Sequence, residues 1–291
     1  MRKHLLASFA LLALFGGSAM AADMAVKARP APICVGCDWN GWYVGFNVGG
    51  SIGRDRTDNT VVMAPFPNGL LNAASLANPI SALSSTRTPA GAVGGGQIGF
   101  NWQVGSWVFG LEGDYDASGQ RDNVASSAFI ASNTVVAPAR LSYTEEQKIK
   151  WLATARARLG WAQDCFLWYV TGGGAWGGLD SNYTFQVQDL AGVANFGTAP
   201  ANASFGSTRS GWTVGGGVET SLAWFGLPTK NWSAKLEYLY VDLGTVTNAF
   251  VVPVTGGCGG TAGCTYTVTN SARIRDNIIR VGLNYRFGGY R

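Results

Sequence analysis

The sequence predicts an all-β protein in which eight antiparallel strands close into a barrel. Three observations support this prediction. Apolar and polar residues alternate with a period of two in eight segments, and the connections between these segments are long and short in turn. The composition is also unusual for a soluble domain: glycine (41 residues) is roughly twice its usual share, and charged residues make up 13% against a usual value of about 25%.

The period-two pattern is clearest in residues 149–161. Ile149 and every second residue after it are apolar, whereas the set that begins at Lys148 contains Arg156 and Arg158 and only one apolar member. A helix would mix the two sets on one face. The segment is therefore expected to be a strand, although alanine, leucine and arginine are good helix formers.

The same alternation predicts seven further strands, in residues 41–52, 97–103, 106–117, 166–178, 211–223, 232–240 and 279–287. For 166–178 the sequence predicts a strand but does not decide which of its residues face the lumen. Long polar stretches separate the strands at 54–90, 120–147, 181–209 and 246–275, and short turns lie near 104–106, 163–165 and 225–231. Since the long stretches fall at every second connection, four long loops are expected at one end of the barrel. Three short turns and both termini are expected at the other end.

The first 21 residues have the features of a secretory signal peptide. Arg2 and Lys3 precede the apolar run 5–15, and Ala19-Met20-Ala21 matches a small-x-small cleavage site. No later run reaches the roughly 18 to 20 apolar residues of a membrane-spanning helix. We therefore expect an exported chain with a signal peptide at 1–21, a periplasmic leader at 22–38, the barrel at 39–287 and a short extension at 288–291.

Composition also excludes several functions. The only histidine, His4, lies in the predicted signal peptide, which excludes histidine-based catalysis and histidine-ligated zinc or haem in the mature chain. We expect no enzymatic activity, no metal and no cofactor. Without Arg2 and Lys3 the mature chain has 19 basic and 17 acidic residues, a balance that does not favour nucleic-acid binding.

The apolar face of the barrel is expected to point outward, into lipid. The ten-residue step from Trp151 to Trp161 covers roughly 25 Å of membrane normal, at a rise of about 3.3 Å per residue and a tilt of about 40°. This is about the height of the apolar band of an outer-membrane barrel, which aromatic girdles flank. The predicted girdle consists of Trp42, Trp102, Trp107, Trp151, Trp161, Trp212 and Trp232.

The polar face then points into the lumen and carries nine charged residues. They are Glu112, Asp114, Arg156, Arg158, Glu219, Lys235, Glu237, Arg280 and Arg286. Buried charges must be paired, so an internal salt-bridge network that closes the barrel is the leading expectation. The alternative is a narrow charge-lined pore, because several inward glycines leave room beside the long side chains.

Two further features lie outside the predicted wall. Cys258 and Cys264 are expected to form a disulfide in the last long loop, whereas Cys34 and Cys37 form either a local disulfide or a bridge to Cys165. Basic residues flank the outer strand ends, namely Arg54, Arg56, Arg121, Lys148, Arg209, Arg273 and Arg275. They either contact phosphates of lipopolysaccharide or belong to an ordinary mixed surface, since acidic residues are interleaved with them.

Several motifs together resemble a known family. They are "AADMAVKA", "WNGWYVGFNVGG", "LEGDYDASG", "WLATARARLGW", "KLEYLYVDLG" and "NIIRVGLNYRF". Over essentially the whole mature chain the sequence is similar to small alphaproteobacterial outer-membrane β-barrel proteins, the porin-like major surface antigens of rhizobia and their relatives, with a transmembrane barrel of the OmpA-like type.

The resemblance implies an eight-stranded barrel in the cell outer membrane, inserted by the barrel assembly machinery through its last strand. The insertion signal is expected at Tyr285 and Phe287, with Tyr290 as the alternative terminal aromatic residue. The expected partners are outer-membrane lipid and lipopolysaccharide, and we expect a monomer. The leading function is a structural, surface-exposed barrel that contributes to envelope integrity; the alternative is a narrow porin for small hydrophilic solutes.

Overall fold

The computed structural model describes residues 38–63, 85–130, 139–189, 199–227, 231–253 and 265–287. All of them belong to one compact unit, Cys34–Arg291. The other unit, Met1–Ile33, lies outside the described residues, as does the predicted signal peptide. Within the described ranges, no helix is long and apolar enough to cross a membrane.

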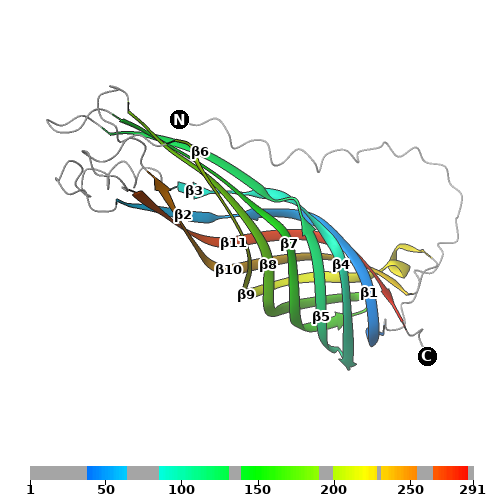
Figure 1. Cartoon of the computed structure of the whole chain (residues 1–291). Helices are drawn as coiled ribbons and strands as arrows, with labels where there is room; N and C mark the ends of the chain where they lie inside the picture. The colour runs from blue at the N-terminus through cyan, green and yellow to red at the C-terminus, as the bar shows by residue number, and fades with distance from the viewer. Residues whose placement is uncertain are drawn as a thin grey trace, which may run out of the picture. The chain divides into compact units, whose positions relative to one another are not determined.

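Eight long strands form the wall of an antiparallel barrel. They are β1 (Gly41–Gly53), β4 (Ala90–Val104), β5 (Trp107–Ser118), β7 (Ala139–Gln163), β8 (Phe166–Asp189), β9 (Ala201–Ser221), β10 (Trp232–Pro253) and β11 (Thr265–Arg286). Each strand pairs with the next in chain order, and β1 also pairs with β11, which closes the ring. The strands wrap obliquely around one axis (Figure 1). The predicted eight-stranded barrel is confirmed, and its closure leaves the wall without a free edge.

The strands continue much further at one end than the sequence pattern indicates. β7 has 25 residues and β8 has 24, whereas roughly 9 to 11 tilted residues cross a bilayer. Three more strands lengthen this end: β2 (Asp55–Met63) pairs with β11, β3 (Ser85–Arg87) with β2, and β6 (Arg121–Ile130) with β7. We term the part of the barrel beyond the membrane band at this end the outer extension.

The outer extension corrects one prediction. Most described residues of 54–90, 120–147, 181–209 and 246–275 are strand, not loop. The physical reason is that their outward side chains meet water instead of lipid. Polar residues therefore occupy the outward positions, and the contrast in hydropathy that marks the membrane strands weakens.

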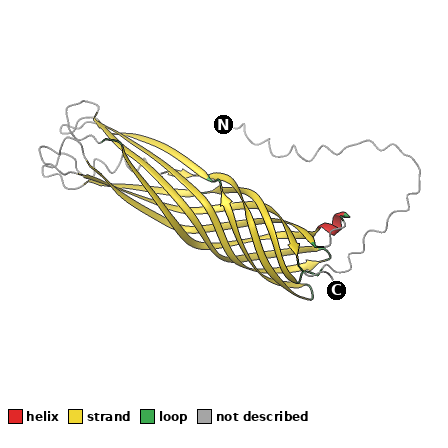
Figure 2. Cartoon of the chain, turned by 45° about the vertical axis from the view of Figure 1, so that its right-hand side comes forward, coloured by secondary structure: helices red, strands yellow, loops and turns green. Residues whose placement is uncertain are grey.

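Tight connections join the strands at the opposite end. Gly105 (φ 61°) and Asp164 (φ 54°) adopt the left-handed conformation in two short turns, where glycine is unstrained and aspartate is tolerated. The third connection begins with the 3-10 helix η1 (Leu222–Phe225), for which Ser221 Oγ accepts the Ala223 N–H. The predicted strand 211–223 therefore ends earlier, at Ser221. Figure 2 shows this helix at the end of the barrel opposite the outer extension.

Within the predicted strands, side chains alternate between the two faces of the wall as expected, except above an irregularity in β7. A register shift between Ile149 and Trp151 reverses the alternation. Ile149, predicted to face lipid, is therefore buried inside, and Lys148 and Lys150, predicted to face inward, point outward. Their ammonium groups lie 2.8 Å from Glu146 and 2.5 Å from Asp180.

The faces of β8, which the sequence left open, are set by its neighbours. Leu167, Tyr169 and Thr171 are buried inside, whereas Trp168 and Val170 are 57% and 60% exposed on the outer face.

Apolar side chains fill the barrel interior at two levels. The cap layer, at the tight-turn end, consists of Trp39, Val108, Cys165, Leu167 and Tyr169. The apolar layer, nearer the outer extension, consists of Val93, Ile149, Leu152, Ala175, Leu179, Leu239, Val241, Leu243, Val246, Ile274 and Ile278. Along β8 the interior thus passes from Leu167 in the cap layer to Ala175 and Leu179 in the apolar layer. The sequence pattern did not predict either layer.

Candidate functional site

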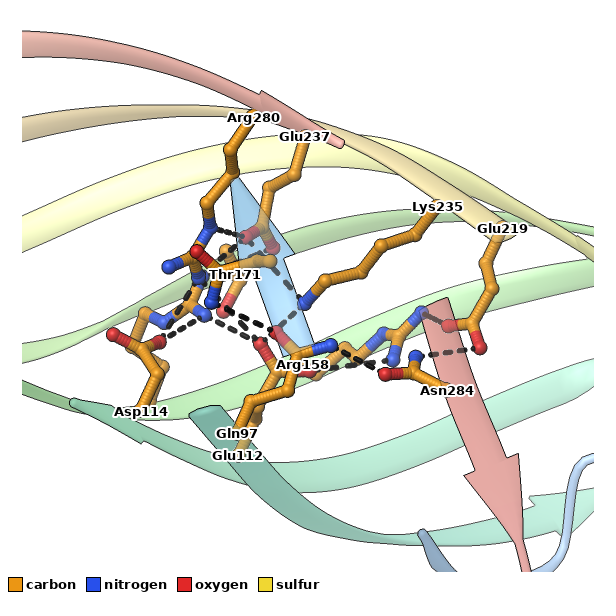
Figure 3. A network of polar contacts seen from close by, with 12 residues as sticks. Gln97, Glu112, Asp114, Arg158, Thr171, Glu219, Lys235, Glu237, Arg280 and Asn284 are labelled. Atoms are coloured by element: carbon orange, nitrogen blue, oxygen red, sulfur yellow. Dashed lines mark hydrogen bonds and ion pairs between the residues drawn. The ribbon is translucent and has the colours of Figure 1, made fainter. Parts of the chain in front are cut away.

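Between the cap layer and the apolar layer, charged side chains from five strands meet inside the barrel (Figure 3). We term them the ionic layer: Glu112, Asp114 and Asp116 of β5, Arg156 and Arg158 of β7, Glu219 of β9, Lys235 and Glu237 of β10, and Arg280 of β11. None of these residues is more than 6% exposed. The period of two sends them all inward, and the strand register decides which of them meet.

The register places opposite charges on neighbouring strands directly side by side. Glu112 is the cross-strand partner of Arg156, and Glu237 is that of Arg280. Lys235 likewise stands opposite Glu219. Cross-strand pairs of opposite charge stabilise a sheet, so the layer begins from favourable local pairings.

Arg156 lies at the centre of the ionic layer and contacts three carboxylates. Its Nη2 is 2.5 Å from Glu112 Oε1 and 2.7 Å from Asp114 Oδ2, and its Nη1 is 3.0 Å from Glu237 Oε1. Its Nε donates to Thr154 Oγ1 at 2.9 Å. These four polar contacts fix the orientation of the guanidinium, because its donors form a rigid fork.

Arg280 contacts the same carboxylates from the opposite side of the barrel. Its Nη2 is 2.7 Å from Glu237 Oε2 and 2.9 Å from Asp114 Oδ2. Its Nη1 is 2.7 Å from Asp116 Oδ2. Because Arg156 and Arg280 share Glu237 and Asp114, side chains of β5, β7, β10 and β11 are tied together across the lumen.

The remaining two bases extend the layer toward the cap layer. Arg158 Nη2 is 2.5 Å from Glu219 Oε2, and its guanidinium lies 3.7 Å from the ring centroid of Tyr169. Lys235 Nζ is 2.9 Å from Glu112 Oε1. Tyr43 Oη donates to Glu112 Oε2 at 2.6 Å and links this carboxylate to Arg158.

Arg286, predicted to belong to the lumen charges, is buried but contacts none of the carboxylates of the ionic layer. Its Nη1 donates to the backbone oxygen of Asp38 at 2.6 Å, and its guanidinium lies 4.3 Å from the ring centroid of Trp39. It is the inward residue nearest the end of β11, below the level of the acidic residues. Asp116, which was not among the predicted lumen charges, belongs to the ionic layer through its contact with Arg280. Because it lies two residues after Asp114, the period of two places it on the same inward face.

Inward glycines give the long side chains their space. A Cβ on Gly99 would lie 2.3 Å from the Tyr43 ring, and one on Gly217 would lie 2.7 Å from Tyr169 Oη. On Gly282 a Cβ would meet the Lys235 stem at 3.2 Å. The sequence-based alternative of a narrow pore depended on the space beside these glycines. In the structure, side chains occupy that space.

A second buried ion pair lies in the outer extension. Arg87 Nη2 is 2.7 Å from Glu145 Oε2, with both side chains at most 2% exposed. Tyr143 Oη and Asn270 Nδ2 each donate to the same oxygen at 3.0 Å. Burial raises the pKa of Glu145, and the charge of Arg87 opposes this shift. The period-two pattern does not reveal this pair, because both residues lie in stretches that were predicted to be loops.

The tryptophans named as a girdle all lie on the outer face of the wall. Near the tight turns, Trp107 packs edge-on against Trp161 with ring centroids 4.9 Å apart, and Trp42, Trp102 and Trp232 lie at the same end of their strands. Nearer the outer extension, Trp151, ten residues before Trp161, stacks on Tyr115 with ring centroids 5.7 Å apart. Trp212 contacts Tyr240 with ring centroids 5.4 Å apart. Their role as a membrane girdle stays a prediction. Trp168 and Trp176 also face outward and were not predicted.

Some predicted sites lie wholly or partly outside the described residues. Cys34, Cys37, Cys258, Cys264 and Tyr290 lie there, so their pairings and roles stay predictions. Cys165 is buried and disulfide-bonded. Tyr285 packs against Trp232 and Phe287, and the role of Tyr285 and Phe287 in insertion stays a prediction.

The arrangement is suited to holding strands together. The carboxylates of the ionic layer each lie within 4 Å of a guanidinium or ammonium group, so that every acidic side chain of the layer has a partner of opposite charge on another strand. In the part of the chain that the structure describes, no three side chains of Cys, His, Asp or Glu are grouped so as to hold a metal ion.

An outward apolar band around a charged interior inverts the distribution of a soluble barrel. Large apolar side chains such as Phe46, Leu111 and Ile279 are 53%, 68% and 60% exposed, whereas the charges of the ionic layer are buried. A surface of this kind is stable only against lipid, so the fold defines a transmembrane β-barrel.

Comparison with known proteins places this barrel in a family. Residues 8–287 match the outer membrane protein beta-barrel domain family, so the chain belongs to that family and to the cell outer membrane. It is 31% identical over 305 aligned positions to the 31 kDa outer-membrane immunogenic protein of Brucella melitensis biotype 1, covering 99% of this chain and 100% of that protein. It is also 31% identical to the 22 kDa outer membrane protein of Rhizobium leguminosarum bv. viciae, over 51% of this chain and 52% of that protein. These matches confirm the alphaproteobacterial outer-membrane resemblance.

Among solved structures, the crystal structure of Neisserial surface protein A matches with a TM-score of 0.29 and 12% identity, covering 83% of this chain and 97% of that one.

Proposed function

We propose that this protein is a closed, non-catalytic structural barrel that contributes to envelope integrity and exposes its outer extension at the cell surface. One observation carries the proposal: the interior is filled at three successive levels, by the cap layer, the ionic layer and the apolar layer. The name of the Brucella relative, an outer-membrane immunogenic protein, supports the surface-exposed part of the proposal.

The energetics of the interior favour closure over conduction. A hydrated ion passing along the axis would have to separate Arg156 from its three carboxylates and would have to pass the cap layer and the apolar layer. Removing one partner of a buried ion pair costs about 3–5 kcal/mol, and transfer of an unpaired ion into an apolar layer costs more. The salt bridges therefore act as a rigid plug that ties opposite walls together.

The test is electrical recording of the purified, folded barrel in planar bilayers. Folding is first established by the difference in gel mobility between unboiled and boiled samples, and insertion by flotation of proteoliposomes. We expect no stable single-channel steps. Stable steps from folded, inserted protein would overturn the closed barrel in favour of the alternative, a narrow porin for small hydrophilic solutes.

Envelope integrity is tested separately in cells. A strain that lacks the gene is expected to become more sensitive to detergent and to recover when the wild-type chain is returned. If the sensitivity of the deletion strain to detergent and bile salts is unchanged, the proposed contribution to envelope integrity is overturned, whatever the result of the conductance measurement.

A further inference from the structure

Four arginines form a cluster on the outer surface of the barrel, away from the ionic layer. Arg54 lies between β1 and β2, Arg56 lies on β2, and Arg273 and Arg275 lie on β11. Together with Asp58, Thr245 and Ser271 they line one surface hollow of about 520 Å³, which we term the arginine hollow. Their side chains are solvent-accessible: those of Arg56, Arg273 and Arg275 are 79%, 51% and 39% exposed.

The strand pairing forces like charges together in this hollow. Arg56 and Arg273 are direct cross-strand partners, and the Arg54 N–H donates to the Arg275 backbone oxygen at 2.9 Å. Like charges that stand directly opposite each other destabilise a sheet. A sheet that keeps Arg56 opposite Arg273, with Arg54 bonded to Arg275 beside them, gains stability when an anion lies between these side chains.

The acidic residues nearby compensate only part of this charge. Asp58 lies 3.4 Å from Arg56, and Asp242 lies 2.8 Å from Arg273 and 3.6 Å from Arg275. The side chain of Arg54 makes no ion pair with any described residue, so two carboxylates face four guanidiniums. The hollow thus retains a positive charge of about two and several free N–H donors, which match a phosphate group in charge and geometry.

The height of the hollow on the barrel indicates where the anion comes from. Ile52 on β1 and Ile279 on β11, each 60% exposed, are the last outward apolar residues below it. Asn277, which accepts a hydrogen bond from Tyr238 Oη at 2.7 Å, lies between Ile279 and Arg275 on the outward side of β11. The arginine hollow therefore opens sideways, immediately above the lipid-facing band at the end that carries the outer extension.

We propose that the arginine hollow binds the phosphate groups of lipid A, the membrane anchor of lipopolysaccharide in the outer leaflet. The acyl chains would lie against the apolar face below Ile52 and Ile279, and a phosphate would lie between Arg56 and Arg273. This site is independent of whether the lumen conducts, because its side chains point away from the barrel interior.

The test measures binding of bis-phosphorylated lipid A to the folded mature chain in detergent micelles, by native mass spectrometry. The variant is R54Q/R56Q, which removes two charges from the hollow without breaking a buried ion pair. The matched control is R121Q, an exposed arginine of the outer extension whose side chain is 65% exposed and lies 3.7 Å from Glu146. Gel mobility before and after boiling confirms that each variant is folded.

We expect R54Q/R56Q to lower the affinity for bis-phosphorylated lipid A by about tenfold or more, and R121Q to leave it within about twofold. The wild type is expected to bind phosphatidylglycerol, which carries one phosphate, at least about tenfold more weakly. Equal binding by R54Q/R56Q and wild type would overturn the site, and equal affinity for phosphatidylglycerol would overturn its assignment to lipid A. If the double variant does not fold, R54Q alone replaces it, because the Arg54 side chain has no ion-pair partner among the described residues.

The unliganded stability gives a second readout that needs no lipid. Because Arg56 and Arg273 repel each other, R56Q is expected to unfold at the same or a higher urea concentration than wild type without lipid A, and to gain less when lipid A is added. A variant that is less stable without lipid A but gains as much as wild type would indicate a structural role for Arg56 and overturn the proposal.

Discussion

Arg280 and Glu237 stand directly opposite each other on β11 and β10, and both Nε and Nη2 of the arginine lie within 2.8 Å of Glu237 Oε2. The same carboxylate reaches Arg156 across the lumen through its other oxygen, Oε1, at 3.0 Å. One glutamate therefore connects a strand neighbour with a strand on the far side of the barrel. The ionic layer thus joins neighbouring strands and also connects strands on opposite sides of the lumen.

Replacement of Glu237 by glutamine should destabilise the barrel strongly. The change leaves Arg156, Arg280 and Lys235 buried with one carboxylate fewer, and breaking a buried pair in this way costs about 3–5 kcal/mol. Urea unfolding of the barrel in lipid vesicles, followed by tryptophan fluorescence, measures this cost. E146Q, which removes the partner of Lys148 in the outer extension, should change the unfolding midpoint little. Equal midpoints for E237Q and wild type would show that the ionic layer adds no stability.

Replacement of Leu239 by alanine tests the apolar layer. Leu239 is fully buried and stands opposite Ile278 on β11, so the change leaves a cavity and should cost about 2–5 kcal/mol. The control is Leu236→Ala on the same strand, whose side chain is 49% exposed on the outer face, where lipid chains can fill the space. Urea unfolding in the same vesicles compares the two. A cost for L236A that equals that for L239A would argue against a packed interior.

Much of the barrel could be predicted because the membrane imposes a simple pattern. Lipid outside and charges inside make every second residue of a membrane strand apolar, so the strands around Trp151 and Arg156 are visible in the sequence alone. The outer extension could not be predicted in this way, because at positions such as Lys148 and Glu146 the outward face is polar.

The pairing within the lumen could be predicted only in outline. The period of two identifies which side chains point inward, but the contacts of Arg156 with Asp114 and Glu237 depend on strand register across the barrel. The reversal of inward and outward positions at Ile149 comes from a single register irregularity, which no local pattern in the sequence predicts. The apolar layer was missed for the same reason, since Ile149 was assigned to the lipid face and Leu152 was a single exception in its set.

The stability of the outer extension should depend on pH through Asp55. This residue is 2% exposed, and burial raises the pKa of its carboxyl group to about 7. The nearby Asp276 and Asp122 also raise this pKa, whereas the hydrogen bond from the Arg275 N–H and the charge of Arg87 lower it. The folded state therefore binds a proton between about pH 4 and pH 7 that the unfolded state releases. Stability contributed by Asp55 is present below about pH 4, falls as the pH rises to about 7, and is constant above that.

Asp55→Asn separates this effect from other titrating groups. Asparagine can still accept the Arg275 N–H, which Asp55 Oδ1 accepts at 3.0 Å, but it carries no charge at any pH. Hydrogen exchange of β2 and β11 amides between pH 4 and pH 8, corrected for the intrinsic exchange rate, should show protection that declines with pH in the wild type and declines less in D55N. D55N should also be the more protected protein at pH 8. Identical pH profiles would contradict the assignment to Asp55.

Cys165 links the cap layer to a second segment of the chain. It is fully buried against Trp39, Val108 and Leu167, and it is disulfide-bonded. For Cys34 and Cys37 the sequence predicts either a local disulfide or a bridge to Cys165, and the bonded state of Cys165 favours the bridge to the leader, which is expected at the same end of the barrel. Cys165→Ala should lower the free energy of unfolding by about 2–5 kcal/mol, because it removes a constraint on the unfolded chain. Unfolding of C165A under non-reducing conditions measures the loss, and peptide mapping of the wild type without reduction identifies the partner. Cys258→Ala should leave the Cys165 crosslink in place, so a map in which this variant loses the crosslink would refute a leader partner.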